Sequence, residues 1–218
     1  AGDTAVRQGL ADFMNQTYDA QVRADNFYMT CGAAASLTIS LKALVESPDD
    51  EIILIAPFFP EYTVFVQNAN AKSVVLPPDT EHFQISLDAL EKAITPHTRA
   101  VIINSPNNPS GVVYSADTYE KLAALLTRKS QEIGHAIYII SDEPYREIIY
   151  DGLPILYVPK FYKDTIICYS YSKSLSLPGE RIGYVLVPDC AADAKEVYTA
   201  VCGAGRSMGF VCAPHLFQ

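Results

Sequence analysis

The stretch that decides the expected fold is Cys168-Tyr169-Ser170-Tyr171-Ser172-Lys173-Ser174-Leu175-Ser176-Leu177-Pro178-Gly179-Glu180-Arg181-Ile182-Gly183-Tyr184. The apolar run 165–169 predicts a buried strand, and Pro178-Gly179 turns the chain toward a second apolar run that ends at Val187. Burial beside the first strand would disfavour the charged form of Lys173 and make it an amine nucleophile, able to form a Schiff base. Ser170 and Arg181 flank the lysine and could hold a phosphate. Taken alone, these residues fit a surface lysine in a turn equally well.

The composition of the 218 residues fits one large domain with a sizeable core. Hydrophobic residues make up 49% and charged residues 19%, which is typical of a soluble globular protein. The net charge of -9 argues against nucleic acid as a partner, because binding to a phosphate backbone requires a basic surface. The sequence has no apolar stretch of membrane-spanning length and no signal peptide, so we expect no membrane partner.

The cysteines are odd in number and lack the spacing of a disulfide framework: Cys31, Cys168, Cys190, Cys202 and Cys212. We expect free thiols in a reducing, cytoplasmic environment. None has a close cysteine or histidine neighbour in the sequence, so no metal site is expected.

Apolar strand patterns alternate with helical periodicity along nearly the whole chain. The expected strands are 26–30, 51–56, 72–76, 98–104, 136–140 and 165–169, and the expected helices are 4–15, 37–45, 62–70, 85–94, 116–133 and 191–203. Ser86 and Ser115 are the expected N-caps of two of these helices. This alternation predicts an α/β fold with three layers, a mostly parallel sheet with helices on both faces.

Ligands bind such open sheets beyond the carboxyl ends of the strands, and each candidate group follows an expected strand. Each one alone also fits an ordinary turn, cap or core residue, but five strand ends carry suitable groups. A planar, phosphorylated, cationic aromatic aldehyde would use them all, and pyridoxal phosphate is such a molecule. The groups are the small-residue helix start Gly32-Ala33-Ala34, the aromatic Phe59, Asn108, the pair Asp142 and Tyr145, and Ser170 with Lys173 and Arg181.

Three motifs resemble those of one known family, in the family's order. Residues 104–111, Asn-Ser-Pro-Asn-Asn-Pro-Ser-Gly, are similar to Asn-Pro-x-Asn-Pro-Thr-Gly, with Ser110 where threonine is usual. Ser-Asp-Glu-Pro-Tyr at 141–145 and Ser-x-Ser-Lys-x-x-x-x-Pro-Gly-x-Arg-x-Gly at 170–183 match closely. On these motifs the chain resembles a class I/II pyridoxal-phosphate-dependent aminotransferase of fold type I, the aspartate aminotransferase-like group.

The resemblance implies a role for each candidate residue. Lys173 would form the Schiff base and move the substrate's α proton, and Asp142 would pair with the pyridine nitrogen. Tyr145 and Asn108 would bind the phenolate oxygen of the ring, and Phe59 would stack on the ring. The phosphate would be held by Gly32, Ala33, Ala34, Ser170 and Arg181.

The resemblance also implies what lies outside this sequence. Family members are considerably longer, so we expect 1–218 to be the cofactor-binding large domain, without the family's N-terminal segment and C-terminal small domain. The family's sites lie at a homodimer interface. We therefore expect this fragment alone to bind cofactor weakly and to have little or no activity.

Three functions remain open on the sequence. The first is an aminotransferase acting on an amino acid and a 2-oxo acid, in amino acid metabolism and biosynthesis. The second is another fold type I enzyme with nearly the same cofactor shell: a C–S β-lyase, a decarboxylase or a cyclopropane-carboxylate synthase, whose turn resembles residues 175–179. The third is the cofactor-sensing domain of a transcription regulator, which requires a basic DNA-binding segment upstream.

Overall fold

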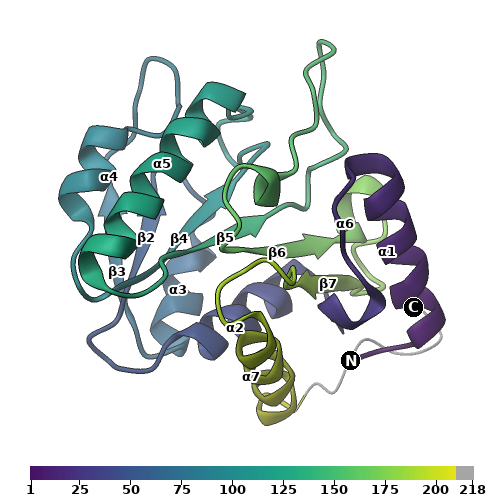
Figure 1. Cartoon of the computed structure of the whole chain (residues 1–218). Helices are drawn as coiled ribbons and strands as arrows, with labels where there is room; N and C mark the ends of the chain where they lie inside the picture. The colour runs from purple at the N-terminus through teal and green to yellow at the C-terminus, as the bar shows by residue number, and fades with distance from the viewer. Residues whose placement is uncertain (210–218) are drawn as a thin grey trace.

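Seven strands form a single sheet in the computed structural model, which describes residues 1–209 (Figure 1). The sheet order is β1-β7-β6-β5-β4-β2-β3. The strands are β1 (Phe27–Thr30), β2 (Glu51–Ile55), β3 (Lys72–Leu76), β4 (Thr98–Asn104), β5 (Tyr138–Asp142), β6 (Thr165–Ser170) and β7 (Gly183–Leu186). Only β7 runs against its neighbours β1 and β6 within this sheet. The predicted mostly parallel α/β sheet is therefore confirmed.

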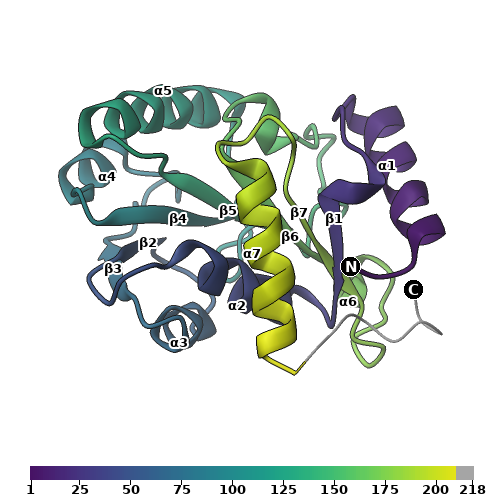
Figure 2. The ribbon, with the colours of Figure 1, turned by 60° about the horizontal axis from the view of Figure 1, so that its bottom comes forward.

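Helices cover both faces of the sheet, as predicted (Figure 2). The described helices are α1 (Thr4–Tyr18), α2 (Ala33–Leu44), α3 (Glu61–Asn68), α4 (Leu87–Ala93), α5 (Ala116–Ile133), α6 (Tyr171–Ser174) and α7 (Ala194–Ser207). Short 3₁₀ turns lie at Ala24–Asn26 and Val158–Lys160. Helices α2, α3 and α7 pack on one face, whereas α4 and α5 cover the other and α1 extends that second layer over β1 and β7.

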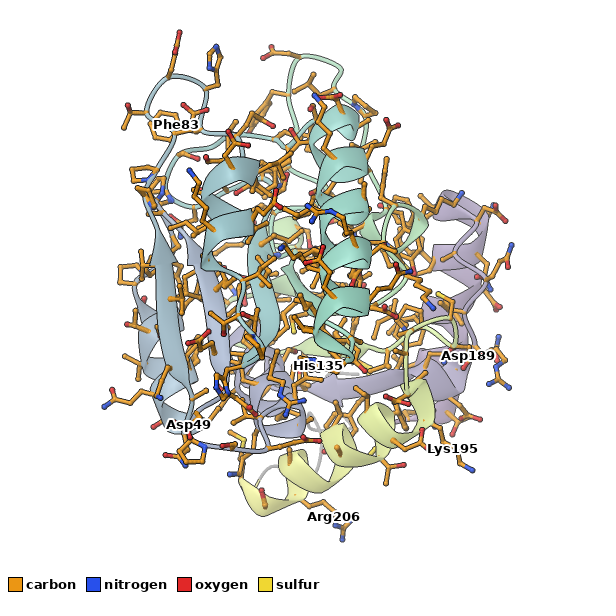
Figure 3. The ribbon with its side chains drawn as sticks, turned by 60° about the vertical axis from the view of Figure 1, so that its left-hand side comes forward. Asp49, Phe83, His135, Asp189, Lys195 and Arg206 are labelled. Atoms are coloured by element: carbon orange, nitrogen blue, oxygen red, sulfur yellow. The ribbon has the colours of Figure 1, made fainter. Side chains whose placement is uncertain are left out.

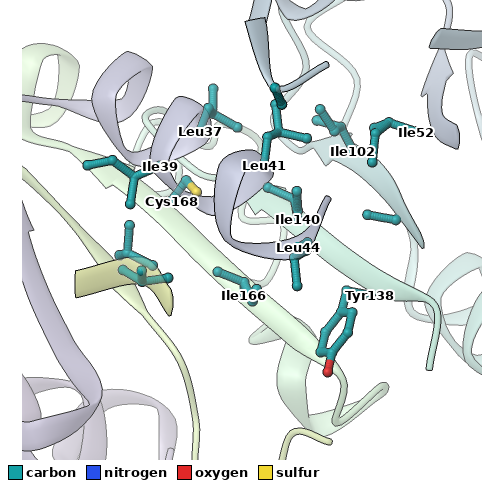
Figure 4. Packing of buried hydrophobic residues seen from close by; sticks show 14 of the residues in the cluster. Leu37, Ile39, Leu41, Leu44, Ile52, Ile102, Tyr138, Ile140, Ile166 and Cys168 are labelled. Atoms are coloured by element: carbon teal, nitrogen blue, oxygen red, sulfur yellow. The ribbon is translucent and has the colours of Figure 1, made fainter. Parts of the chain in front are cut away.

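The period-two alternation of the strands separates the two cores. In β6, Ile166 and Cys168 point toward α2, and Ile167 and Tyr169 point toward α1. Figure 4 shows the α2 side, where Leu41 lies against side chains of the central strands. Because both faces are covered, the central strands are apolar nearly throughout, as expected of a buried parallel sheet.

The two edges of the sheet differ in what they carry. The carboxyl ends of six strands and the start of β7 meet at one edge, where the β3–α4 loop with Phe83 also projects (Figure 3). Asp49, His135 and Asp189 lie at the opposite edge. Gly183 begins β7 at the first edge, where a Cβ would collide with the carbonyl oxygen of Tyr169. All the candidate site residues are therefore carried to one edge.

Several predicted boundaries were wrong by a few residues. Strand β5 spans Tyr138–Asp142 rather than 136–140, because its parallel pairing with β4 and β6 continues to Asp142. The helix expected at 191–203 is Ala194–Ser207. Ser86 occupies the N-cap of α4 but its side chain makes no capping hydrogen bond, whereas Ser115 caps α5 as predicted. Cys212 and the chain end lie outside the described residues.

Candidate active site

A cavity of about 250 Å³ opens at the carboxyl edge of the sheet. It is lined by predicted residues from six separate segments of the chain, namely Ala33, Ala34, Phe59, Asn108, Asp142, Tyr145, Ser170, Lys173 and Arg181. Gly32 lies directly beside it, since a Cβ there would be 2.8 Å from Nη2 of Arg181. The structure thus brings together all the residues that the strand-end argument selected.

Asp142 provides a buried carboxylate in this cavity. Asp142 is 5% exposed, and the Tyr62 hydroxyl donates a hydrogen bond of 2.5 Å to its Oδ2. Among the described residues, Oδ1 has no hydrogen-bond partner. Burial raises the pKa of Asp142 from 3.8 to about 7, although the Tyr62 hydrogen bond opposes the rise. A buried carboxylate oxygen without a donor is costly, so a cationic N–H group reaching Oδ1 would be stabilised strongly.

Asn108 and Tyr145 form a polar pair beside Asp142. Nδ2 of Asn108 lies 3.3 Å from the Tyr145 hydroxyl, and the backbone N–H of Asn108 donates to the side chain of Asn104. Asn104, the last residue of β4, in turn donates to the carbonyl of Asp142 on β5. The loop is therefore tied to the neighbouring strand, which fixes Asn108 opposite Tyr145.

An anion cradle lies at the start of α2. Gly32 is the N-cap with φ of 93°, and α2 begins directly with Ala33 and Ala34, so the residues at the start of this helix are small. The guanidinium of Arg181 lies against Gly32 and donates to the Pro178 carbonyl at 3.1 Å. The backbone amides at a helix start, the helix dipole and a cation together favour a phosphate group.

Lys173 lies at the mouth of the cavity on the one-turn helix α6. The sequence predicted a lysine desolvated at the end of a strand, and the structure corrects this: the side chain is exposed. The reason is that β6 ends at Ser170 and the α6 turn carries Lys173 beyond the sheet edge. Within residues 1–209, no hydrogen bond or ion pair engages Nζ of Lys173, so its amine is accessible to a ligand.

Sequence reasoning missed three contributors to the site. Tyr62 supplies the hydrogen bond to Asp142, Asn104 ties the Asn108 loop to β5, and Ser172 lies between Ser170 and Arg181. Asn104 and Ser172 belong to motifs that were already singled out. Tyr62 ends the aromatic run that follows β2, but no sequence signal linked it to Asp142, because only the packing of α3 against the sheet brings its hydroxyl there.

The comparisons with known proteins agree with this geometry. Residues 1–214 match the family "Aminotransferase class I and II", and the chain belongs to that family. A probable N-acetyl-LL-diaminopimelate aminotransferase of Bacillus subtilis (strain 168) is 31% identical over 190 residues, which cover 86% of this chain and 46% of that protein. A probable aspartate aminotransferase of Methanocaldococcus jannaschii is 33% identical over 189 residues, which cover 86% of this chain and 48% of that protein.

Solved structures give the same result. An amino transferase from Eubacterium rectale is 62% identical with a TM-score of 0.98, over 99% of this chain and 54% of that one. Aspartate aminotransferase from Thermus thermophilus with maleate is 26% identical with a TM-score of 0.87, over 100% of this chain and 54% of that one. The chain spans about half the length of the curated relatives that it matches.

Proposed function

We propose that this chain is the cofactor-binding large domain of a pyridoxal-phosphate-dependent aminotransferase, which moves an amino group between an amino acid and a 2-oxo acid. The observation that carries the proposal is the buried Asp142, whose Oδ1 lacks a donor among the described residues, in the same cavity as the accessible amine of Lys173. The membership of the chain in the aminotransferase family supports it.

The residues fit pyridoxal phosphate group by group. The α2 amides at Gly32, Ala33 and Ala34, with Ser170 and Arg181, would hold the phosphate. Phe59 would stack on the ring, and Asn108 with Tyr145 would bind the phenolate oxygen. Asp142 would accept a hydrogen bond at Oδ1 from the protonated ring nitrogen, which provides the donor that this buried oxygen lacks.

When bound, the cofactor supplies an aldehyde that condenses with amines and a ring that withdraws electrons from the substrate's α carbon. Tyr62 holds Oδ2 of Asp142, so Oδ1 remains directed to one partner. The amine of Lys173 would be the attachment point and would remove and return the proton at the α carbon. Arg181 and the α2 amides would keep the phosphate fixed while that proton moves.

The wider setting is also part of the proposal. We expect a homodimer in the cytoplasm, by analogy with the family, and the remaining half of the relatives' length to complete the substrate site. The relatives' names include aspartate, aromatic and diaminopimelate-derived substrates, so the substrate's side chain stays open. Within residues 1–209, no helix is both long and apolar enough to cross a bilayer.

A paired turnover assay tests this function. The protein at its full encoded length is incubated with an amino acid, with and without 2-oxoglutarate, and the products are identified by mass spectrometry. The proposal predicts that the amino group appears on the oxo acid and that turnover beyond one equivalent requires it. Sustained release of ammonia, carbon dioxide or a thiol without an oxo acid would instead indicate a lyase or decarboxylase.

A further inference from the structure

A buried ionic cluster lies behind the active site, on the α1 side of the sheet. Arg146 and Glu143 form an ion pair of 3.0 Å, with both side chains 4% exposed. Arg146 also donates to the Tyr184 hydroxyl at 3.0 Å and to Oε1 of Glu147 at 3.1 Å. Removing an arginine from water is costly unless its N–H groups are paired, and here each of its three nitrogens has a partner.

The cluster continues to α6 through one tyrosine. The Tyr169 hydroxyl donates to Oε2 of Glu147 at 2.7 Å and lies 2.9 Å from Oγ of Ser174. A hydroxyl has a single proton, and the carboxylate is the stronger acceptor, so Ser174 must be the donor in the second contact. The Arg146 guanidinium, 4.4 Å from the centre of the Tyr169 ring, holds that ring in place.

Ser174 is the last residue of α6 and directly follows Lys173. A helix of one turn has little stability of its own, so its orientation depends on external anchors. On the cavity side, Ser170 caps α6 by accepting a hydrogen bond from the Ser172 amide. On the opposite side, Ser174 is anchored to the ionic cluster, and Lys173 lies between the two anchors.

We propose that Tyr169 and Glu147 are positioning residues for Lys173, which act by fixing α6 through Ser174. The inference rests on the proposed attachment of the cofactor to Lys173. The segment 142–147 then has two functions, because Asp142 and Tyr145 line the cavity while Glu147 holds the helix that carries the lysine.

The test separates attachment at Lys173 from non-covalent binding of pyridoxal phosphate, in the protein at its full encoded length. Attachment is measured by borohydride reduction and quantitative peptide mapping. Non-covalent affinity is measured by equilibrium dialysis in a Lys173→Ala background. Ser174→Ala should reduce the equilibrium constant for attachment about five- to tenfold, the effect expected for the loss of one hydrogen bond. Tyr169→Phe also removes the hydrogen bond to Glu147 and should reduce that constant at least as much. Non-covalent affinity should change less than about twofold, because the residues proposed to bind the cofactor are untouched.

Three comparisons make the test specific. The double variant Ser174→Ala/Tyr169→Phe should resemble Tyr169→Phe alone, because Tyr169→Phe already removes the hydrogen bond that Ser174→Ala removes. Ser174→Thr keeps the hydroxyl and should restore attachment. Tyr138→Phe, which removes a buried tyrosine hydrogen bond of 2.8 Å to Ala192 at the opposite edge of the sheet, should leave attachment unchanged.

Unchanged attachment in both single variants would overturn the inference. Equal losses of attachment and of non-covalent affinity would also overturn it, because they would indicate a general loss of structure. Absence of a label on Lys173 in the parent protein would overturn the proposed function, and this inference with it.

Discussion

Replacing Asp142 with asparagine should flatten the pH dependence of the unfolding free energy of the cofactor-free protein. Burial raises the pKa of Asp142 to about 7 from 3.8 in the folded state, so the folded protein binds this proton more tightly than the unfolded chain does. The unfolding free energy is therefore highest below the unfolded-state pKa. It falls as the pH rises through the interval between the two pKa values, and the loss is complete above the folded-state pKa.

The magnitude follows from the size of the pKa shift. A rise of about 3 pKa units corresponds to about 4 kcal/mol across the whole interval. Between about pH 5 and about pH 8, the parent should lose roughly 2 to 3 kcal/mol through this group, whereas Asp142→Asn should lose none through it. The asparagine oxygen can still accept the hydrogen bond from Tyr62, so the substitution changes the charge with little change in shape.

The assay is urea unfolding at a series of pH values, with the parent and variant compared at each one. Asp12→Asn is the matched control, because it removes an exposed carboxylate from α1 and should reproduce the parent's pH profile. An Asp142→Asn profile parallel to that of the parent would refute the reasoning, since it would mean that Asp142 is not a carboxyl group with a raised pKa.

Three further predictions concern the residues around the site. Tyr62→Phe removes the hydrogen bond to Asp142, so an NMR titration should show a further rise in the pKa of that carboxyl. The variant should also lose about 1 to 3 kcal/mol of unfolding free energy near neutral pH. Gly32→Ala should weaken pyridoxal phosphate binding in a titration, because the added Cβ would displace the guanidinium of Arg181. Gly134→Ala is the control: Gly134 has a similarly positive φ of 83°, but no atom lies within 4 Å of the added Cβ, so this variant should lose stability and keep its affinity for pyridoxal phosphate. Arg146→Met leaves a buried carboxylate without its ion-pair partner and should cost about 3 to 5 kcal/mol in urea unfolding.

Much of the fold was predictable because its signals are local. The alternation of apolar strands with amphipathic helices indicated a parallel sheet, and strand-end placement then brought residues as distant as Ala33 and Lys173 to one edge. The β5 boundary was missed because polar Ser141 and Asp142 interrupt the apolar pattern, although both remain paired in the sheet. Pairing with neighbouring strands therefore extends β5 beyond the end of its apolar run.

The parts of the site that were missed depend on tertiary contacts. The hydrogen bond between Tyr62 and Asp142 joins residues 80 positions apart, and no spacing in the sequence encodes it. The exposure of Lys173 depends on α6, a turn too short to leave a periodic pattern. The link from Glu147 through Tyr169 to Ser174 likewise exists only once β6 lies beside β5.

Mapping the lysine that carries the cofactor tests the central proposal most directly. The protein at its full encoded length is loaded with pyridoxal phosphate, reduced with borohydride, digested and mapped by mass spectrometry. We predict a pyridoxyl group on Lys173 in the parent and on no lysine in Lys173→Ala. The variant should still bind the cofactor non-covalently, through the anion cradle at the start of α2. A label on Lys42, Lys72 or Lys163 in the parent would contradict the assignment of this cavity as the active site.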